Sequence, residues 1–278
     1  MWKRGSFAFA CGLITLACGA TSAPSPRTAR AGSADPAGIL LAIGAECCAV
    51  LRRPERSIED LDAARREAQG PERRALTRDL IVAYAFAAED ADGREARRMR
   101  RRAEQLADAA VRGARDPDYL AEIAFAKLWL SWRAGSRNAE QRATRFTERH
   151  RSSGDLLALA WMIRGEIALS DERFEDAVTA FRFGLGQLGH PLYAYALWRT
   201  AAAYRRLGRA EDAAQALAEV EQLGCPASAS PFVVRIATAA AGERASGLRR
   251  DPDGVTRPAS CPPPESREAE DEGWRPAE

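Results

Sequence analysis

The sequence predicts an all-α fold in which pairs of helices stack as a solenoid. Residues 158–223 contain one helix-pair pattern written twice. Corresponding residues are offset by 36, as in the pairs Gly165/Ala201, Ala177/Ala213 and Phe181/Leu217. The small residues of each copy suit two antiparallel helices whose backbones approach closely. A period of this size is typical of helical repeats, and no stretch alternates apolar and polar residues as a half-buried strand does.

The helix-pair pattern has a recognisable set of large and small residues. In the first copy these are Trp161, Gly165, Ala177, Phe181 and Gly184, and in the second they are Leu197, Ala201, Tyr204, Gly208, Ala213 and Leu217. This pattern resembles the tetratricopeptide repeat family, although Arg164, Ala168 and Thr200 depart from it. Pro191 falls two residues late at the repeat junction. The repeat length is therefore 36 residues, whereas the family has about 34. The resemblance implies a right-handed superhelical α-solenoid of about five helix-turn-helix pairs.

Residues 1–17 are expected to be a secretion signal. Lys3 and Arg4 precede a short apolar run at residues 7–17. This run is too short to span a bilayer of roughly 30 Å as a helix. The residues from Ile14 to Cys18 resemble a bacterial lipobox, so Cys18 is the expected site of lipidation.

Residues 18–36 are expected to be a flexible linker behind the lipid. They are rich in Ser, Ala, Thr, Pro and Gly, a composition that cannot bury enough apolar surface to fold. Gly19 stands where some bacteria use Asp to retain lipoproteins in the inner membrane, so we expect a periplasm-facing protein anchored in the outer membrane. The alternative is cleavage after Ala20 or Ala23, which would give a soluble secreted or periplasmic protein.

Residues 37–243 are expected to form the repeat domain. Apolar stripes and turn residues predict helices at 37–51, 54–69, 72–89, 94–112, 117–134 and 138–149 before the two clear copies. Residues 231–241 can add a closing helix over the last apolar face. The composition then changes sharply, and residues 244–278 are expected to be a disordered tail.

The candidate partner-binding residues come from the resemblance. The first helix of each tetratricopeptide pair lines a concave groove, and the family tends to bind extended peptides there. Mapped onto the second copy, groove-facing residues are Tyr195, Trp198 and Arg205, with Arg206 beside them. Aromatic residues with Arg often carry binding hot spots. The alternative is that Trp198 packs against a neighbouring helix.

The cysteines and the arginines allow further interpretations. Cys47 and Cys48 would point about 100° apart on one helix, so a bond between them would require breaking it, and Cys47 is expected to be a small buried hydrophobe. For Cys225 and Cys261 there are two alternatives, a disulfide between them or two free thiols. Several arginines at residues 94–102 share a helix face, which is either solvated or a contact for anionic lipid or an acidic partner.

The sequence favours binding over catalysis. Neither of the two histidines has metal-ligand spacing, and we find no nucleophile elbow, phosphate loop or dinucleotide fingerprint. We therefore expect no catalytic residues, metal or cofactor, and a net charge of +2 makes no case for nucleic-acid binding. The expected function is a non-enzymatic adaptor for a protein or peptide in a cell-envelope complex. The alternative is a solute-binding or transporter-associated periplasmic subunit.

Overall fold

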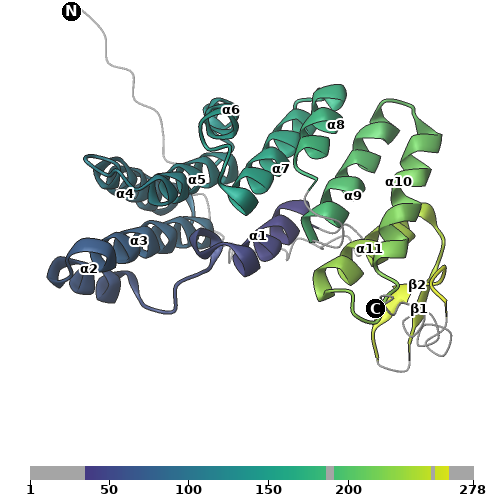
Figure 1. Ribbon diagram of the computed structural model, residues 1–278, viewed down its shortest axis with the longest axis horizontal. Helices are drawn as coiled ribbons and strands as arrows, with labels where there is room; N and C mark the ends of the chain where they lie inside the picture. The colour runs from purple at the N-terminus through teal and green to yellow at the C-terminus, as the bar shows by residue number, and fades with distance from the viewer. Residues whose placement is uncertain (1–34, 186–190, 252–253, 263–278) are drawn as a thin grey trace, which may run out of the picture. The chain divides into compact units, whose positions relative to one another are not determined.

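Helices make up most of the regular structure (Figure 1). A computed structural model describes residues 35–185, 191–251 and 254–262. The helices in these residues are α1 (Pro36–Cys47), the 3₁₀ helix η1 (Ala49–Leu51), α2 (Ile58–Glu67), α3 (Gly70–Asp90), α4 (Gly93–Ala110), α5 (Pro117–Arg133), α6 (Ala139–Arg149), α7 (Gly154–Ser170), α8 (Phe174–Phe183), α9 (Pro191–Arg206), α10 (Ala210–Leu223) and α11 (Pro231–Arg244). None of these described helices is both long and apolar enough to cross a membrane.

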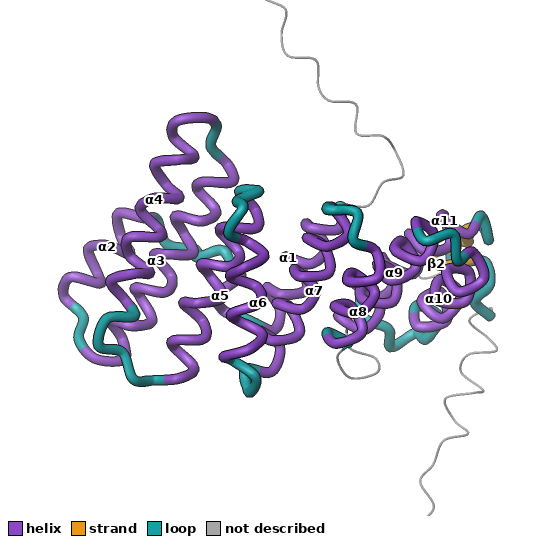
Figure 2. Tube along the Cα trace, turned by 90° about the horizontal axis from the view of Figure 1, so that it is seen from above, coloured by secondary structure: helices purple, strands orange, loops and turns teal. Residues whose placement is uncertain are grey.

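From α3 onward, each helix packs mainly against its neighbours in the sequence. The pairs α3/α4, α5/α6, α7/α8 and α9/α10 form hairpins, and contacts between α6 and α7 and between α8 and α9 join them (Figure 2). The second helices α4 and α6 begin at Gly93 and Ala139, each within one residue of the start expected from the sequence. This sequential packing is consistent with a helical repeat.

The small residues of the repeat pattern lie where helices meet. A Cβ atom added to Gly165 on α7 would collide with the Phe181 ring on α8. Ala177, Ala201 and Ala213 are 0%, 0% and 2% exposed. Gly165 therefore lies at a close contact between paired helices, and the three alanines are buried, as the repeat pattern predicts.

The expected helices at 37–51 and 54–69 would be the first pair of the repeat domain, but this is wrong, since α1 does not form a hairpin with α2. Instead α2 packs on α3, whereas α1 contacts α7 and α9, and η1 contacts α3 and α5 (Figure 1). Ile39, Leu40 and Ile43 of α1 are at most 1% exposed. A helix that is apolar nearly all round needs partners on several sides, and α1 finds two of them in α7 and α9.

The expected helix at residues 37–51 is interrupted at Cys48. The backbone there is extended, with φ −131° and ψ 116°, and it separates α1 from η1. Cys48 is buried, whereas Cys47 lies at the surface. The expectation that Cys47 is the buried residue is therefore wrong.

Part of the expected disordered tail is folded. Strands β1 (Leu248–Arg250) and β2 (Thr256–Pro258) pair antiparallel and pack on α11, which is the expected closing helix. Cys225 and Cys261 form a disulfide, with their Cα atoms 5.1 Å apart. The tail thus begins with a hairpin stapled to the end of α10, so the all-α description is corrected here; residues 263–278 lie outside the described part.

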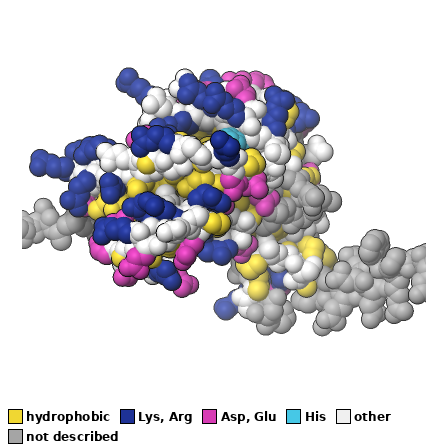
Figure 3. All heavy atoms as spheres, turned by 60° about the vertical axis from the view of Figure 1, so that its left-hand side comes forward, with side chains coloured by type: hydrophobic (Ala, Val, Ile, Leu, Met, Phe, Trp, Pro, Cys, Tyr) yellow, Lys and Arg dark blue, Asp and Glu magenta, His cyan; other side chains and the backbone are white. Residues whose placement is uncertain are grey.

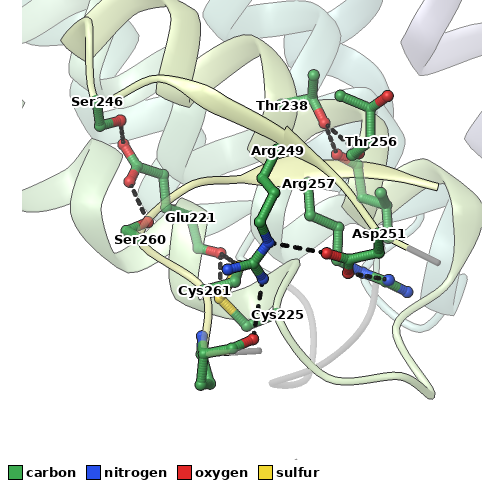
Figure 4. Close-up of a disulfide and its surroundings, with 12 residues drawn as sticks. Glu221, Cys225, Thr238, Ser246, Arg249, Asp251, Thr256, Arg257, Ser260 and Cys261 are labelled. Atoms are coloured by element: carbon green, nitrogen blue, oxygen red, sulfur yellow. Dashed lines mark hydrogen bonds and ion pairs between the residues drawn. A yellow bond between two sulfur atoms is a disulfide. The ribbon is translucent and has the colours of Figure 1, made fainter. Parts of the chain in front are cut away.

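The folded tail is held by buried charges (Figure 4). Glu221 is 0% exposed and accepts hydrogen bonds from the hydroxyls of Ser246 at 2.8 Å and Ser260 at 2.7 Å. The Asp251 carboxylate accepts hydrogen bonds from Arg249 Nε and Arg257 Nη1, each at 2.9 Å. Polar residues that suggest a solvated tail in the sequence therefore satisfy each other inside the fold.

Candidate partner-binding cleft

α1 packs on α7 and α9, the first helices along which the resemblance implies a groove. On α7, the side chain of Leu159 is 0% exposed. A Cβ atom added to Gly44 of α1 would lie 3.4 Å from the Leu159 side chain, so the two helices are in close contact. α1 thus lies against the helices on which the resemblance implies a bound peptide.

The two aromatic candidates are buried in the same region. Tyr195 is 0% exposed and Trp198 is 3% exposed, and their rings meet edge to face with centroids 6.0 Å apart. The Tyr195 hydroxyl donates to Glu166 at 3.0 Å, and Trp198 Nε1 donates to Glu243 at 2.7 Å. The expectation that these rings face an open groove is therefore wrong, because both pack against neighbouring helices.

A buried ion pair beneath these rings was missed in the sequence. Arg199 binds Glu166 through two hydrogen bonds, Nε to Oε1 at 2.6 Å and Nη2 to Oε2 at 2.9 Å. Burial raises the pKa of Tyr195 well above its ordinary value, and the nearby Glu166 carboxylate raises it further. Burial lowers the pKa of Arg199, but the attraction of Glu166 outweighs it and leaves that pKa raised. The sequence holds one signal for the pair, since Arg199 follows Tyr195 by one helical turn and so lies on the same helix face.

An open cleft remains at the C-terminal ends of α7 and α9. Its volume is about 560 Å³, and it lies next to the turn between α7 and α8. The lining residues are Leu169, Ser170, Glu172, Phe174, Ala202, Arg205 and Arg206. We call this site the α7–α9 cleft. Two of the four expected partner-binding residues, Arg205 and Arg206, therefore line a cleft that solvent can enter.

The two arginines are held in place but keep free donor capacity. Arg206 lies over the Phe174 ring at 5.1 Å and contacts Glu172 at 3.4 Å, and Arg205 pairs with Glu243. Their side chains are 60% and 42% exposed, respectively. A guanidinium has five N–H groups, so each arginine can still donate to a carbonyl or a carboxylate in the cleft.

Glu172 in this cleft has an unusual backbone. Its φ is +59°, in the left-handed region that costs a non-glycine residue about 1–2 kcal/mol. The corresponding residue of the next repeat, 36 positions later, is Gly208, with φ +73°. A strained residue held where the neighbouring copy uses glycine points to a role for the Glu172 side chain.

We expect Glu172→Gly to raise the free energy of unfolding by about 1 kcal/mol or less, because relief of strain exceeds the extra chain entropy of glycine. Urea unfolding of the purified protein measures it. Gly208→Ala, the matched control at the equivalent turn, should instead lower stability by about 1 kcal/mol. Equal losses in both variants would show that Glu172 carries no such strain.

The arginine-rich face of α4 is exposed as expected. Arg94, Arg97, Arg98 and Arg101 are all exposed, and Arg98 pairs with Glu95 at 2.8 Å. Figure 3 shows the left-hand side of Figure 1, with dark-blue Lys and Arg side chains spread over it between white and magenta ones. The mixture of signs is typical of a solvated face.

Cys18, the expected lipidation site, lies outside the described residues. The chain matches no protein-family model, no curated protein and no solved structure. The described part of the chain is therefore identified by its architecture alone, as a mostly helical protein whose helices pack in sequential pairs.

Proposed function

We propose that this protein is a non-enzymatic adaptor that holds a segment of a partner protein in the α7–α9 cleft. The proposed fold is a right-handed α-solenoid of the tetratricopeptide type, closed along its groove by α1. The observation that carries the proposal is the cleft itself, in which two exposed arginines and an aromatic ring surround about 560 Å³ of open space. Arginine donors beside an apolar ring suit an acidic or extended peptide segment.

The nature of the cleft favours an adaptor over a solute-binding subunit. A small solute is usually held in an enclosed and mostly apolar pocket. The α7–α9 cleft instead carries Arg205, Arg206 and Glu172 at its surface. Charged, exposed groups of this kind are common at the rim of a protein–protein contact.

Site-directed photo-cross-linking in intact cells tests the partner surface. We expect a photoreactive residue at Ser170, which is exposed and lines the cleft, to yield a discrete adduct with one partner. The same residue at Gln105, exposed on α4, should not yield it. Combining the Ser170 probe with Arg205→Ala and Arg206→Ala should reduce the adduct at least about tenfold, which corresponds to a loss of about 1.4 kcal/mol. The same adduct from both probes, or none from Ser170, would contradict the proposal.

The proposed location is the outer membrane, with the folded domain tethered through Cys18 and facing the periplasm. Several acyl chains on one cysteine would bind the membrane more tightly than a single chain does. We expect a palmitate analogue to label the wild-type protein in cells and to leave Cys18→Ser unlabelled. The variant should also move from the membrane fraction to the soluble one. Equal labelling of the two proteins would rule out this anchor.

A further inference from the structure

Two adjacent cysteines at the end of α1 face a carboxylate at the start of α7. The Sγ atoms of Cys47 and Cys48 are 3.1 Å apart. A carboxylate oxygen of Asp155 and both sulfur atoms all lie within 4.8 Å of one another. These three residues line a cleft of about 210 Å³, together with Glu122 and Ser153. Three potential metal ligands thus converge at one solvent-accessible point.

The backbone explains why the two thiols lie together. Neighbouring residues on a continuous helix would point about 100° apart. Here α1 ends at Cys47 and the chain turns to an extended conformation at Cys48, so both side chains reach the same side. The interruption of the apolar run at Cys48 therefore creates the thiol pair.

The carboxylate of the cluster forms no ion pair with a cationic side chain of the described residues. Among the residues that the structure describes, no Lys, Arg or His forms an ion pair with Asp155, whereas Glu122 in the same cleft lies 3.3 Å from Arg78. We propose that Cys47, Cys48 and Asp155 bind a thiophilic divalent cation of the zinc class, with the fourth position open to water. Two thiolates and one carboxylate match the soft and borderline ligands that such an ion prefers.

The site needs only small side-chain movements to close on an ion. Tetrahedral zinc has Zn–S distances of about 2.3 Å and Zn–O distances of about 2.0–2.2 Å, which places two sulfurs roughly 3.7 Å apart. The sulfurs must therefore separate slightly from 3.1 Å and the Asp155 oxygen must approach them. Binding would displace one proton from each thiol, since the thiolate is the ligand. A disulfide between the two cysteines would instead require about 2.05 Å and would give Asp155 no role.

A cation bound here would join two parts of the chain that are about a hundred residues apart. The sulfur ligands end α1 and the oxygen ligand begins α7, the helix against which α1 packs. The ion would therefore fasten α1 in the groove. Besides binding itself, a second readout is therefore available: amide hydrogen exchange in α1 should be slower when the metal is present.

Metal titration of the full chain tests the site. The cysteines are first reduced under mild conditions, and mass spectrometry verifies that the buried Cys225–Cys261 bond is intact. We expect one Zn²⁺ per chain by equilibrium dialysis, and Co²⁺ should give a sulfur-to-metal charge-transfer absorption. Cys47→Ser and Asp155→Asn, both at the surface, should each weaken Zn²⁺ binding by at least about tenfold, because even the loss of an outer-shell partner commonly costs 10–100-fold.

A matched control distinguishes Zn²⁺ binding at this site from nonspecific binding to exposed carboxylates. Asp118 is the second residue of α5, as Asp155 is of α7, and it is exposed. Asp118→Asn should leave Zn²⁺ affinity unchanged and should retain the slower exchange of α1. The proposal is overturned if Zn²⁺ affinity is the same in all three variants and the wild type. It is also overturned if the reduced wild-type chain binds no Zn²⁺, or if Cys47 and Cys48 are joined by a disulfide in protein isolated from cells.

Discussion

Trp198→Ala should lower the free energy of unfolding by roughly 3–5 kcal/mol, because it leaves a large cavity in the core. The indole is 3% exposed, packs edge to face on Tyr195 and donates its Nε1 hydrogen to Glu243. Urea unfolding followed by circular dichroism measures the change. A ring that faced an open groove would instead contribute little to stability, and its removal would mainly weaken partner binding.

Trp198→Phe is the matched control for packing. It keeps most of the apolar contact but removes the donor to Glu243. The expected loss is smaller, about 1 kcal/mol, because Glu243 also pairs with Arg205 and keeps part of its side chain in water. A loss below about 1 kcal/mol in Trp198→Ala itself would contradict the buried position of this residue.

Arg199→Met should also destabilise the protein by about 3–5 kcal/mol, because it leaves the Glu166 carboxylate buried without its cation. The side chains of Arg199 and Glu166 are only 15% and 11% exposed, so water cannot replace the lost partner well. Thermal and urea unfolding both report the loss.

The double variant Glu166→Gln/Arg199→Met separates the pair from the packing around it. It removes the unpaired charge, so we expect it to recover most of the stability lost in Arg199→Met. Equal losses in the single and double variants would show that the stem of Arg199, and not its charge, stabilises the interface between α7 and α9.

The repeats were predictable because their packing is encoded locally. Gly165 and Ala213 have to be small wherever paired helices touch, so the offset of 36 correctly indicated α7 to α10. The tail was not predictable in the same way. Arg257 and Asp251 read as solvated charges in the sequence, and only their pairing inside the fold shows that they are buried.

The exposure of the candidate partner-binding residues could be predicted only in part. Arg205 and Arg206 line an open cleft because the family pattern places them near the end of a first helix. Tyr195 and Trp198 were misplaced because the pattern assumes an empty groove. The apolar run of α1 predicts that this helix is buried, but its contacts on α7 and α9 lie more than a hundred residues away, and no local pattern encodes them.

The central proposal is that α1 docks on α7 and α9 and leaves the α7–α9 cleft open. Hydrogen exchange of the full-length protein tests this most directly, because a docked helix opens only with the elements it packs on. We expect amides of residues 40–47 to exchange as slowly as those in the middle of α7. Exchange of these amides at the rate of an unstructured peptide, with α7 still protected, would contradict the account.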